Sequence, residues 1–429
     1  MTFFNKVYDL VFRKSALRVL RHRSYAIYLA TDFMSNCGQW AFRVGTGWLA
    51  WDLTHSGFWL GVVAMMAALP FFTILPIAGA FADRSNKLNI IKATRSCGIA
   101  LTMVLFVLTI TDTINIYILC VLTLLVAINQ TFTQPVRLTM APSLVPPEDI
   151  APAIGLNAGM QSSARFLGPM IGGLMIAGIG VSSVFILNSF SFSIAVVGLM
   201  NVDKLMFESN RTGARASLFA DVIEGWRYSF SHKSIGPMIT LIFIVSICTR
   251  PFLELFPGFN DEVFHQGPEG LGTLMSAVGI GGIAGSIFIS NFSKSRALLF
   301  LSFSLMAVTA CLALVFAWTT TFSIGVAAVI GLGFCITCWQ STTTVLIQTS
   351  VEGRMRARVM SIYALTFRAC SSLGAMIVGF ASHSYGLQVP LAACAGVALL
   401  TLLAYMPKMR MLGTEFEAGL AAMTKKRET

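Results

Sequence analysis

The chain has 429 residues, of which 55% are hydrophobic and only 11% charged, and its mean hydropathy is +0.75. Because about a quarter of the residues of a soluble globular protein are charged, this composition excludes an ordinary soluble domain and predicts many apolar spans of about 20 residues each. The net charge of +11 does not indicate a nucleic-acid partner. The basic residues cluster at the ends of apolar segments, and no basic patch is interleaved with aromatic residues.

The nine cysteines and five histidines predict neither a disulfide framework nor a metal site. Seven of the cysteines lie singly in apolar runs, where cysteine behaves as a small hydrophobic residue. Cys335 and Cys338 have CxxC spacing, but no second pair or histidine cluster accompanies them. The sequence contains no phosphate-binding glycine loop and no Ser/His/Asp constellation. We therefore expect no metal, no cofactor and no enzymatic activity.

Residues 1–23 are strongly basic, with Asp9 as their only acidic residue. No small-residue cleavage site follows them, so they predict a cytoplasmic segment on the inner leaflet rather than a signal peptide. Residues 24–201 are predicted to form a first half of six helices. The expected spans are 25–53, 58–81, 90–110, 114–141, 150–179 and 181–200.

The polar stretch 202–235 is the only long hydrophilic break inside the chain, and it is predicted to be a cytoplasmic linker. Residues 236–406 repeat the first half's alternation of apolar segments and short loops, and are predicted to form a second half of six helices. Residues 407–429 form a predicted cytoplasmic tail. The expected spans are 236–259, 268–292, 296–317, 320–346, 356–382 and 387–406. The sequence therefore predicts an all-α membrane protein with twelve transmembrane helices.

Lysine and arginine are divided unevenly between the loops. Basic residues occupy the loops on the side of the N-terminus, including Arg84, Lys87 and the 202–235 stretch. The opposite loops, near 52–57, 111–113, 178–181, 260–267, 318–320 and 383–386, contain none. By the positive-inside rule, both termini are expected in the cytoplasm and the protein in the cell inner membrane.

The two halves share an internal repeat. Without any gap, Leu167, Gly168 and Gly173 of the fifth span align with Leu373, Gly374 and Gly379 of the eleventh. Earlier in the halves, Leu60-Gly61 matches Leu271-Gly272. The repeat predicts two parallel, pseudo-symmetric six-helix halves related by an axis along the membrane normal.

The loop after the second span combines small residues with charges. Gly79 lets helix ends come close, Asp83 can cap the next helix or accept a hydrogen bond, and Arg84 and Lys87 keep the loop in water. This stretch resembles the loop signature Gly-x-Leu-Ala-Asp-Arg-x-Gly-Arg-Lys of the major facilitator superfamily. The resemblance implies the major facilitator fold and a cytoplasmic gate formed by these four residues.

The fifth span holds a charge, a helix-bending proline and a face of small residues. Ala164, Gly168 and Gly172 recur every fourth residue, which by itself is ordinary small-xxx-small packing. The stretch also resembles the antiporter signature Gly-x-x-x-Gly-Pro-x-x-Gly-Gly of the same superfamily, which implies an exporter. The motif residues are Arg165, Gly168, Pro169, Gly172 and Gly173. We expect this face to meet the run 279–285 of the eighth span.

Residues 35–54, 250–257 and 354–361 narrow the resemblance to the drug:proton antiporter branch, similar to macrolide-efflux and enterobactin-exporter-like proteins. Many members of that branch carry an arginine within the fourth span. Here the only candidate is Arg137, near the inner end of that span, which is a departure from the pattern.

Ionisable residues inside spans are candidates for function. Asp32 has no obvious partner in its own helix, so it is either a proton-coupling carboxylate or a residue of helix packing or water contact. Arg250 and Glu254 are four residues apart, and either form an ion pair or take part in proton coupling through Glu254. Arg43, Arg165 and Arg368 are further candidates of this kind.

The superfamily uses its first, fourth, seventh and tenth spans to line the substrate cavity. Apolar and aromatic walls with a few amides suit large amphipathic solutes. The cavity candidates are Asn36, Gln39, Trp40, Arg43, Gln130, Gln134, Trp339 and Gln340.

The resemblance thus implies a monomeric secondary transporter that exports small amphipathic molecules, such as a drug, macrolide or siderophore, with protons as the coupling ion. The alternatives are an importer of a nutrient or siderophore complex and a non-transporting membrane scaffold or sensor.

Overall fold

The computed structural model describes residues 16–200, 218–232, 234–289, 295–351 and 353–407. All the regular elements in these ranges are helices, which confirms the predicted all-α class. Residues 1–15 of the basic segment, 201–217 of the linker and 408–429 of the tail lie outside the described ranges.

The helices of the first half begin and end close to the predicted spans. They are η2 (Ala16–Arg21), α2 (Arg23–Thr54), α3 (Gly57–Thr73), α4 (Leu75–Arg84), α5 (Lys87–Ile110), α6 (Ile116–Ser143), η3 (Pro147–Asp149), α7 (Ile150–Ile179) and α8 (Ser182–Met200). Those of the second half are α9 (Leu218–Ser231), α10 (Ile235–Thr249), α11 (Phe252–Gly258), η5 (Phe259–Val263), α12 (Pro268–Ile289), α13 (Ser295–Trp318), α14 (Phe322–Ser350), α15 (Gly353–Tyr385) and a last helix, Gln388–Pro407.

Ten helical stretches in the described ranges are long and apolar enough to cross a membrane. The first two predicted spans are not among them. α2 has 32 residues but contains Asp32 and Arg43, and α3 has only 17 residues. The number of twelve spans therefore stays a prediction.

Two predicted spans are interrupted, in both cases near a proline. The second divides into α3 and α4, with a proline at the start of α4. The seventh divides at Arg250–Pro251, which separates α10 from α11. Proline lacks a backbone N–H and disfavours helical geometry in the residue before it. The cap of α5 is Asn86, whose side chain accepts from the N–H groups of Leu88 and Asn89, and not Asp83.

The chain folds into two compact units. Unit 1 comprises residues 1–49 and 69–214, and unit 2 comprises 50–68 and 215–429. The end of α2 and most of α3 thus group with the second unit. The predicted boundaries of segment, halves, linker and tail stay a prediction. Each unit is described by itself below.

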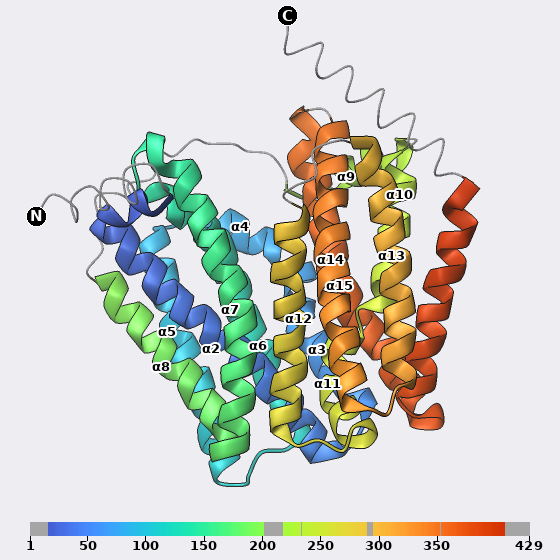
Figure 1. Ribbon diagram of the computed structural model, residues 1–429. Coiled ribbons are helices and arrows are strands. Elements are labelled where there is room, and N and C mark those ends of the chain that lie inside the picture. Colours follow the sequence, from blue (N-terminus) through green and yellow to red (C-terminus); the bar gives the residue numbers. More distant parts are fainter. Residues whose placement is uncertain (1–15, 201–217, 233, 290–294, 352, 408–429) are drawn as a thin grey trace, which may run out of the picture. The chain divides into compact units, whose positions relative to one another are not determined.

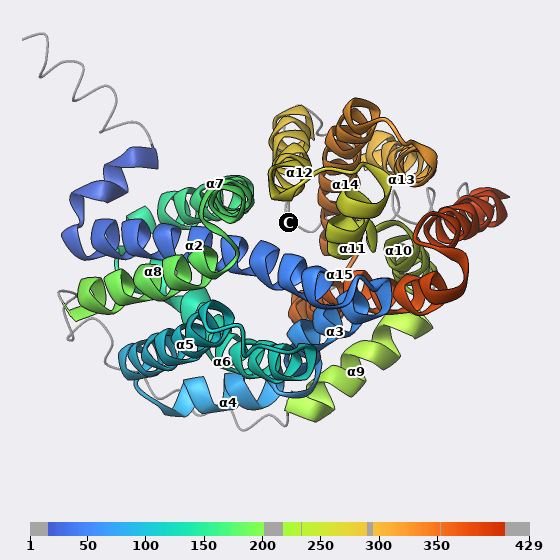
Figure 2. The same cartoon turned by 90° about the horizontal axis from the view of Figure 1, so that it is seen from below.

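In unit 1, α2 lies between α7 on one side and α8 on the other (Figure 2). Glycines make both approaches close. Gly38 of α2 lies against Ser191 of α8, and Gly168 of α7 lies against Cys37 and Trp40 of α2. α5 packs on α6 and α8, and α6 packs on α7. Tight packing by small residues is how membrane helices associate, because lipid supplies no hydrophobic driving force.

In unit 2, α14 packs between α12 and α13, and α15 packs on α9, α10 and α11 (Figure 1). The ring of Phe316 in α13 is surrounded by four phenylalanines of the α11–η5 region, with centroids 5.0–6.1 Å away. The segment 50–68 belongs to this unit because Gly61 of α3 lies against the backbone of Ala375 and Met376 in α15.

The expected contact between the glycine faces of the fifth and eighth spans is wrong. A Cβ atom on Gly168 or Gly172 would meet α2, so this face of α7 is occupied within unit 1. Gly281 and Gly285 of α12 lie against the backbone of α14 within unit 2. The spacing of the glycines indicates that both faces are shaped for close packing but does not specify which helix each one meets.

Replacing Gly168 by alanine should weaken the packing of α7 on α2. The new Cβ would lie 2.5 Å from Trp40 Cβ and 2.7 Å from the Cys37 carbonyl oxygen. We expect a loss of about 1–3 kcal/mol, seen as a lower thermal unfolding temperature in detergent. Gly159→Ala is the matched control on the same helix, because nothing lies within 4 Å of its Cβ position. Equal stability of the two variants would contradict this packing.

Candidate functional site

Asp32 is at the centre of a buried network of charges in unit 1. Arg95 of α5 donates to Asp32 Oδ1 at 3.2 Å, and Arg137 of α6 donates to Oδ2 at 3.0 Å. Asn36, one turn along α2, donates to Oδ2 at 2.9 Å and accepts a hydrogen bond from Arg137 at 3.0 Å. The side chain of Asp32 is only 3% exposed. One carboxylate therefore joins α2, α5 and α6.

Two arginines around one carboxylate leave the network with an excess positive charge in an apolar interior. The guanidinium of Arg95 also lies 4.9 Å from the ring centroid of Phe192, which stabilises a cation. The Nε atoms of Arg95 and Arg137 are buried and have no hydrogen-bond partner among the described residues. Purely structural polar networks are normally satisfied, so this one is a candidate for function.

Asp32 is identifiable from the sequence, but its partners are not. Arg95 lies inside the predicted third span, and a charge at such a position is the sequence signal that marks it as a candidate for function. Arg137 stands out in the sequence only as a departure from a family pattern. The structure brings it to Asp32 although 105 residues separate the two. Contacts between helices so distant in sequence depend on packing that no single segment encodes.

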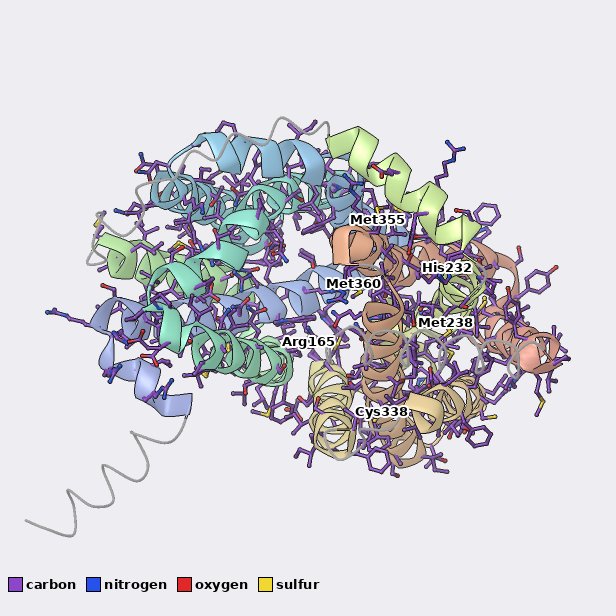
Figure 3. All side chains as sticks on the ribbon, turned by 90° about the horizontal axis from the view of Figure 1, so that it is seen from above. Arg165, His232, Met238, Cys338, Met355 and Met360 are labelled. Atoms are coloured by element: carbon purple, nitrogen blue, oxygen red, sulfur yellow. The ribbon has the colours of Figure 1, made fainter. Side chains whose placement is uncertain are left out.

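A second group of charged and aromatic side chains joins α2 and α7 in unit 1. The guanidinium carbons of Arg43 and Arg165 lie 5.5 and 5.6 Å from the ring centroid of Trp40. Both arginines are exposed, and Trp40 is half-buried. Figure 3 shows that Arg165 projects from α7. Gly168 makes this contact possible, because its missing side chain lets α7 lie against the Cβ of Trp40.

The remaining cavity candidates occupy different environments. Gln39, Gln130, Gln134 and Gln340 are partly buried. Trp339 is fully buried, 5.2 Å from the ring of Phe367, so it lies inside unit 2 and not on a surface that a solute could contact. Asn36 belongs to the Asp32 network rather than to an open wall.

In unit 2 the two expected partners stand on opposite sides of the helix break. Arg250 ends α10, and its guanidinium lies 5.3 Å from the ring centroid of Phe367. Glu254 lies in α11 and accepts a hydrogen bond from Ser371 at 3.2 Å. Pro251 between them means that they do not share one continuous helix as the sequence suggested.

A hydrogen bond that no sequence pattern indicates joins the end of α2 to η5 within unit 2. The indole N–H of Trp51, which is almost fully buried, donates to Asp261 Oδ2 at 2.8 Å. His55 Nδ1 lies 3.6 Å from the same oxygen. Leu387 and Trp51 enclose Gly258, so this end of the unit is closely packed.

The predicted cytoplasmic gate is described only in part. Gly79 has open space around its Cβ position, and Lys87 is the first residue of α5. The side chains of Asp83 and Arg84, like that of Arg368, lie outside the described part of the structure. The gate therefore stays a prediction.

The sequence of the chain is similar to that of known membrane transporters. A family model described as "Transmembrane secretion effector" matches residues 14–426. The staphyloferrin A transporter of Staphylococcus aureus is 24% identical over 365 residues, covering 84% of this chain and 90% of that protein. The multidrug efflux pump Tap of Mycolicibacterium fortuitum is 23% identical over 384 residues, covering 85% and 91%. Macrolide efflux protein A of Streptococcus pyogenes is 19% identical over 347 residues, covering 79% and 84%.

Solved structures share the fold at low sequence identity. The nucleoside transporter NupG superposes with a TM-score of 0.72 at 13% identity, covering 90% of this chain and 99% of that one. A bacterial homologue of the iron transporter ferroportin gives a TM-score of 0.66 at 15% identity, covering 93% and 98%.

Removing the charge of Asp32 should destabilise unit 1. Asp32→Asn leaves Arg95 and Arg137 buried without a counter-charge, which costs about 3–5 kcal/mol. We expect a clearly lower unfolding temperature in detergent. Asp52→Asn is the control, because Asp52 is exposed near the end of the same helix. If both variants unfold at the wild-type temperature, the network does not stabilise the fold.

Proposed function

We propose that this chain, which belongs to the transmembrane secretion effector family of major facilitator transporters, exports a small amphipathic molecule across the inner membrane. The export would proceed by alternating access, with inward proton flow as its energy source. The observation that carries the proposal is the buried carboxylate of Asp32 between two arginines from different helices. The match of 168–173 to the antiporter signature, and the efflux relatives, support the direction.

The network offers a simple way to link a proton to a change in packing. When Asp32 takes up a proton, its negative charge is lost, and Arg95 and Arg137 are left as two buried like charges. Such an arrangement is costly in a low-dielectric interior. The network is therefore expected to open, moving α2 relative to α5 and α6. Release of the proton restores the ion pairs and the original packing.

The same helix face links this network to the residues proposed to contact substrate. Asp32, Asn36, Trp40 and Arg43 follow one another at spacings of three or four residues on α2, and such spacings place residues on one face of a helix. A movement of α2 that begins at Asp32 therefore also moves Trp40 and Arg43. Glu254 and Arg250 remain secondary coupling candidates in unit 2.

Export can be tested in vesicles from cells that produce the protein. With an imposed proton gradient, everted vesicles should accumulate rhodamine 110 several-fold over vesicles lacking the protein, and a protonophore should abolish the difference. Asp32→Asn should remove proton-driven accumulation, whereas Asp52→Asn should retain it.

Each deviation from this result has a defined meaning. Accumulation only in right-side-out vesicles would establish import. Accumulation that is insensitive to the protonophore would refute proton coupling. Full activity of Asp32→Asn would exclude Asp32 as the coupling carboxylate, and a phenotype that survives both Asp32→Asn and Arg43→Ala would favour a scaffold or sensor.

The bond between Trp51 and Asp261 joins the end of α2 to η5 within unit 2 and should stabilise that unit. Asp261→Ala leaves the buried indole N–H without an acceptor, at a cost of about 1–3 kcal/mol. A double-mutant cycle with Trp51→Phe should therefore show a favourable coupling energy in thermal unfolding. Asp261→Asn keeps an acceptor oxygen and should be milder. Asp112→Asn, at an exposed loop position, is the control, because asparagine tolerates the positive φ of that residue. Additive effects of Trp51→Phe and Asp261→Ala would contradict a stabilising hydrogen bond between the two side chains.

A further inference from the structure

Arg165 occupies a position where a cation is costly. It lies near the middle of the 30-residue helix α7, about 22 Å from either end at 1.5 Å per residue. The hydrocarbon core is about 30 Å thick, so lipid phosphates at its edges are too distant to neutralise the guanidinium. An arginine at the centre of a span costs at least about 2.5–3.5 kcal/mol if it faces lipid.

No carboxylate among the described residues forms an ion pair with Arg165. Its charged neighbour in unit 1 is Arg43, whose like charge repels it, and both cations lie at the ring of Trp40. The aromatic ring offsets part of this cost, because its face attracts cations. Arg165 nevertheless keeps an exposed surface, and because lipid would not neutralise its charge, we take this surface to face water or an anionic solute.

The position of Arg165 relative to Trp40 is set by the packing of α7 on α2. Gly168 lies one turn from Arg165 and against Trp40 Cβ, and a Cβ atom on Gly172 would lie 3.0 Å from the Cα of Ala41. These contacts hold α7 on α2, so that Arg165 and Trp40 keep the same relation. The indole of Trp40 with the guanidinium of Arg165 beside it forms a suitable binding site for an aromatic molecule that carries a carboxylate.

We propose that Arg165, with Trp40 and Arg43, recognises a carboxylate group on the exported molecule. This inference rests on the proposed function and adds the chemical class of the substrate, an amphipathic aromatic carboxylate. The guanidinium of Arg165 binds the carboxylate, and the indole of Trp40 contacts the apolar part. Arg43 lies at the same indole ring, 5.5 Å from its centroid.

The corresponding positions of the second half have different chemistry. Gly374, the repeat equivalent of Gly168, lies against Ile247 and Pro251. At the repeat position of Arg165 stands Ser371, which donates its hydroxyl hydrogen to Glu254. The packing is thus shared by the two halves, whereas the cationic group belongs to unit 1. A charge that packing alone required would be expected in both.

Two dyes that differ only at one group can test the proposal. Rhodamine 110 has a free carboxylate, and rhodamine 123 is its methyl ester. Binding of each to the purified full-length protein in nanodiscs can be measured by fluorescence anisotropy. We expect the wild type to prefer rhodamine 110, and Arg165→Ala to weaken its binding on the order of tenfold or more while leaving the ester unchanged. Arg165→Lys should retain part of the preference.

The control variant is Arg227→Ala, which removes an exposed arginine of α9 and should bind both dyes like the wild type. Equal binding of the two dyes by the wild type, no binding of rhodamine 110, or an equal loss for both dyes in Arg165→Ala would each overturn the inference. A protein that binds rhodamine 110 through Arg165 but accumulates nothing in vesicles would refute export and leave the recognition intact.

Discussion

The cost of placing charge in an apolar environment governs this protein more than any other constraint. With 11% charged residues, most of the chain can meet lipid without penalty. The few ions inside its helices must be paired, stacked on rings or exposed to water. Asp32 is paired twice, Arg95 is both paired and stacked, and Arg165 is stacked and exposed. The candidate site is the place where this constraint is least fully satisfied.

Much of the architecture could be predicted because it depends on local composition. A span of apolar residues is visible within a window of 20 residues, and proline or a polar stretch marks its end. The helix bounds near 110, 179 and 200 followed from such signals. The break at Pro251 was also encoded locally, but the continuous apolar pattern around it concealed the interruption.

The partners of the charged residues could not be predicted in the same way. Asp32 was identified from its helix, but Arg95 and Arg137 reach it from helices placed by the packing of α2, α5, α6 and α8. The spacing of the glycines in α7 and α12 indicates that each helix packs closely on a neighbour, but it does not specify which helix that neighbour is. Trp339 is an aromatic residue of the kind expected in a cavity wall, but it is enclosed in the core of unit 2. Sequence identifies the chemistry available, whereas packing decides which groups meet.

The membership of α2 in both units has a mechanical consequence. The helix is continuous from Arg23 to Thr54, yet it contributes residues up to Leu49 to unit 1 and its last turn to unit 2. Asp32 is held on one side of this division and Trp51 on the other, about 28 Å apart along the axis. The same continuous helix is therefore held by a buried charge network in unit 1 and by a hydrogen bond in unit 2. A change at either contact acts on a helix that the other contact also holds.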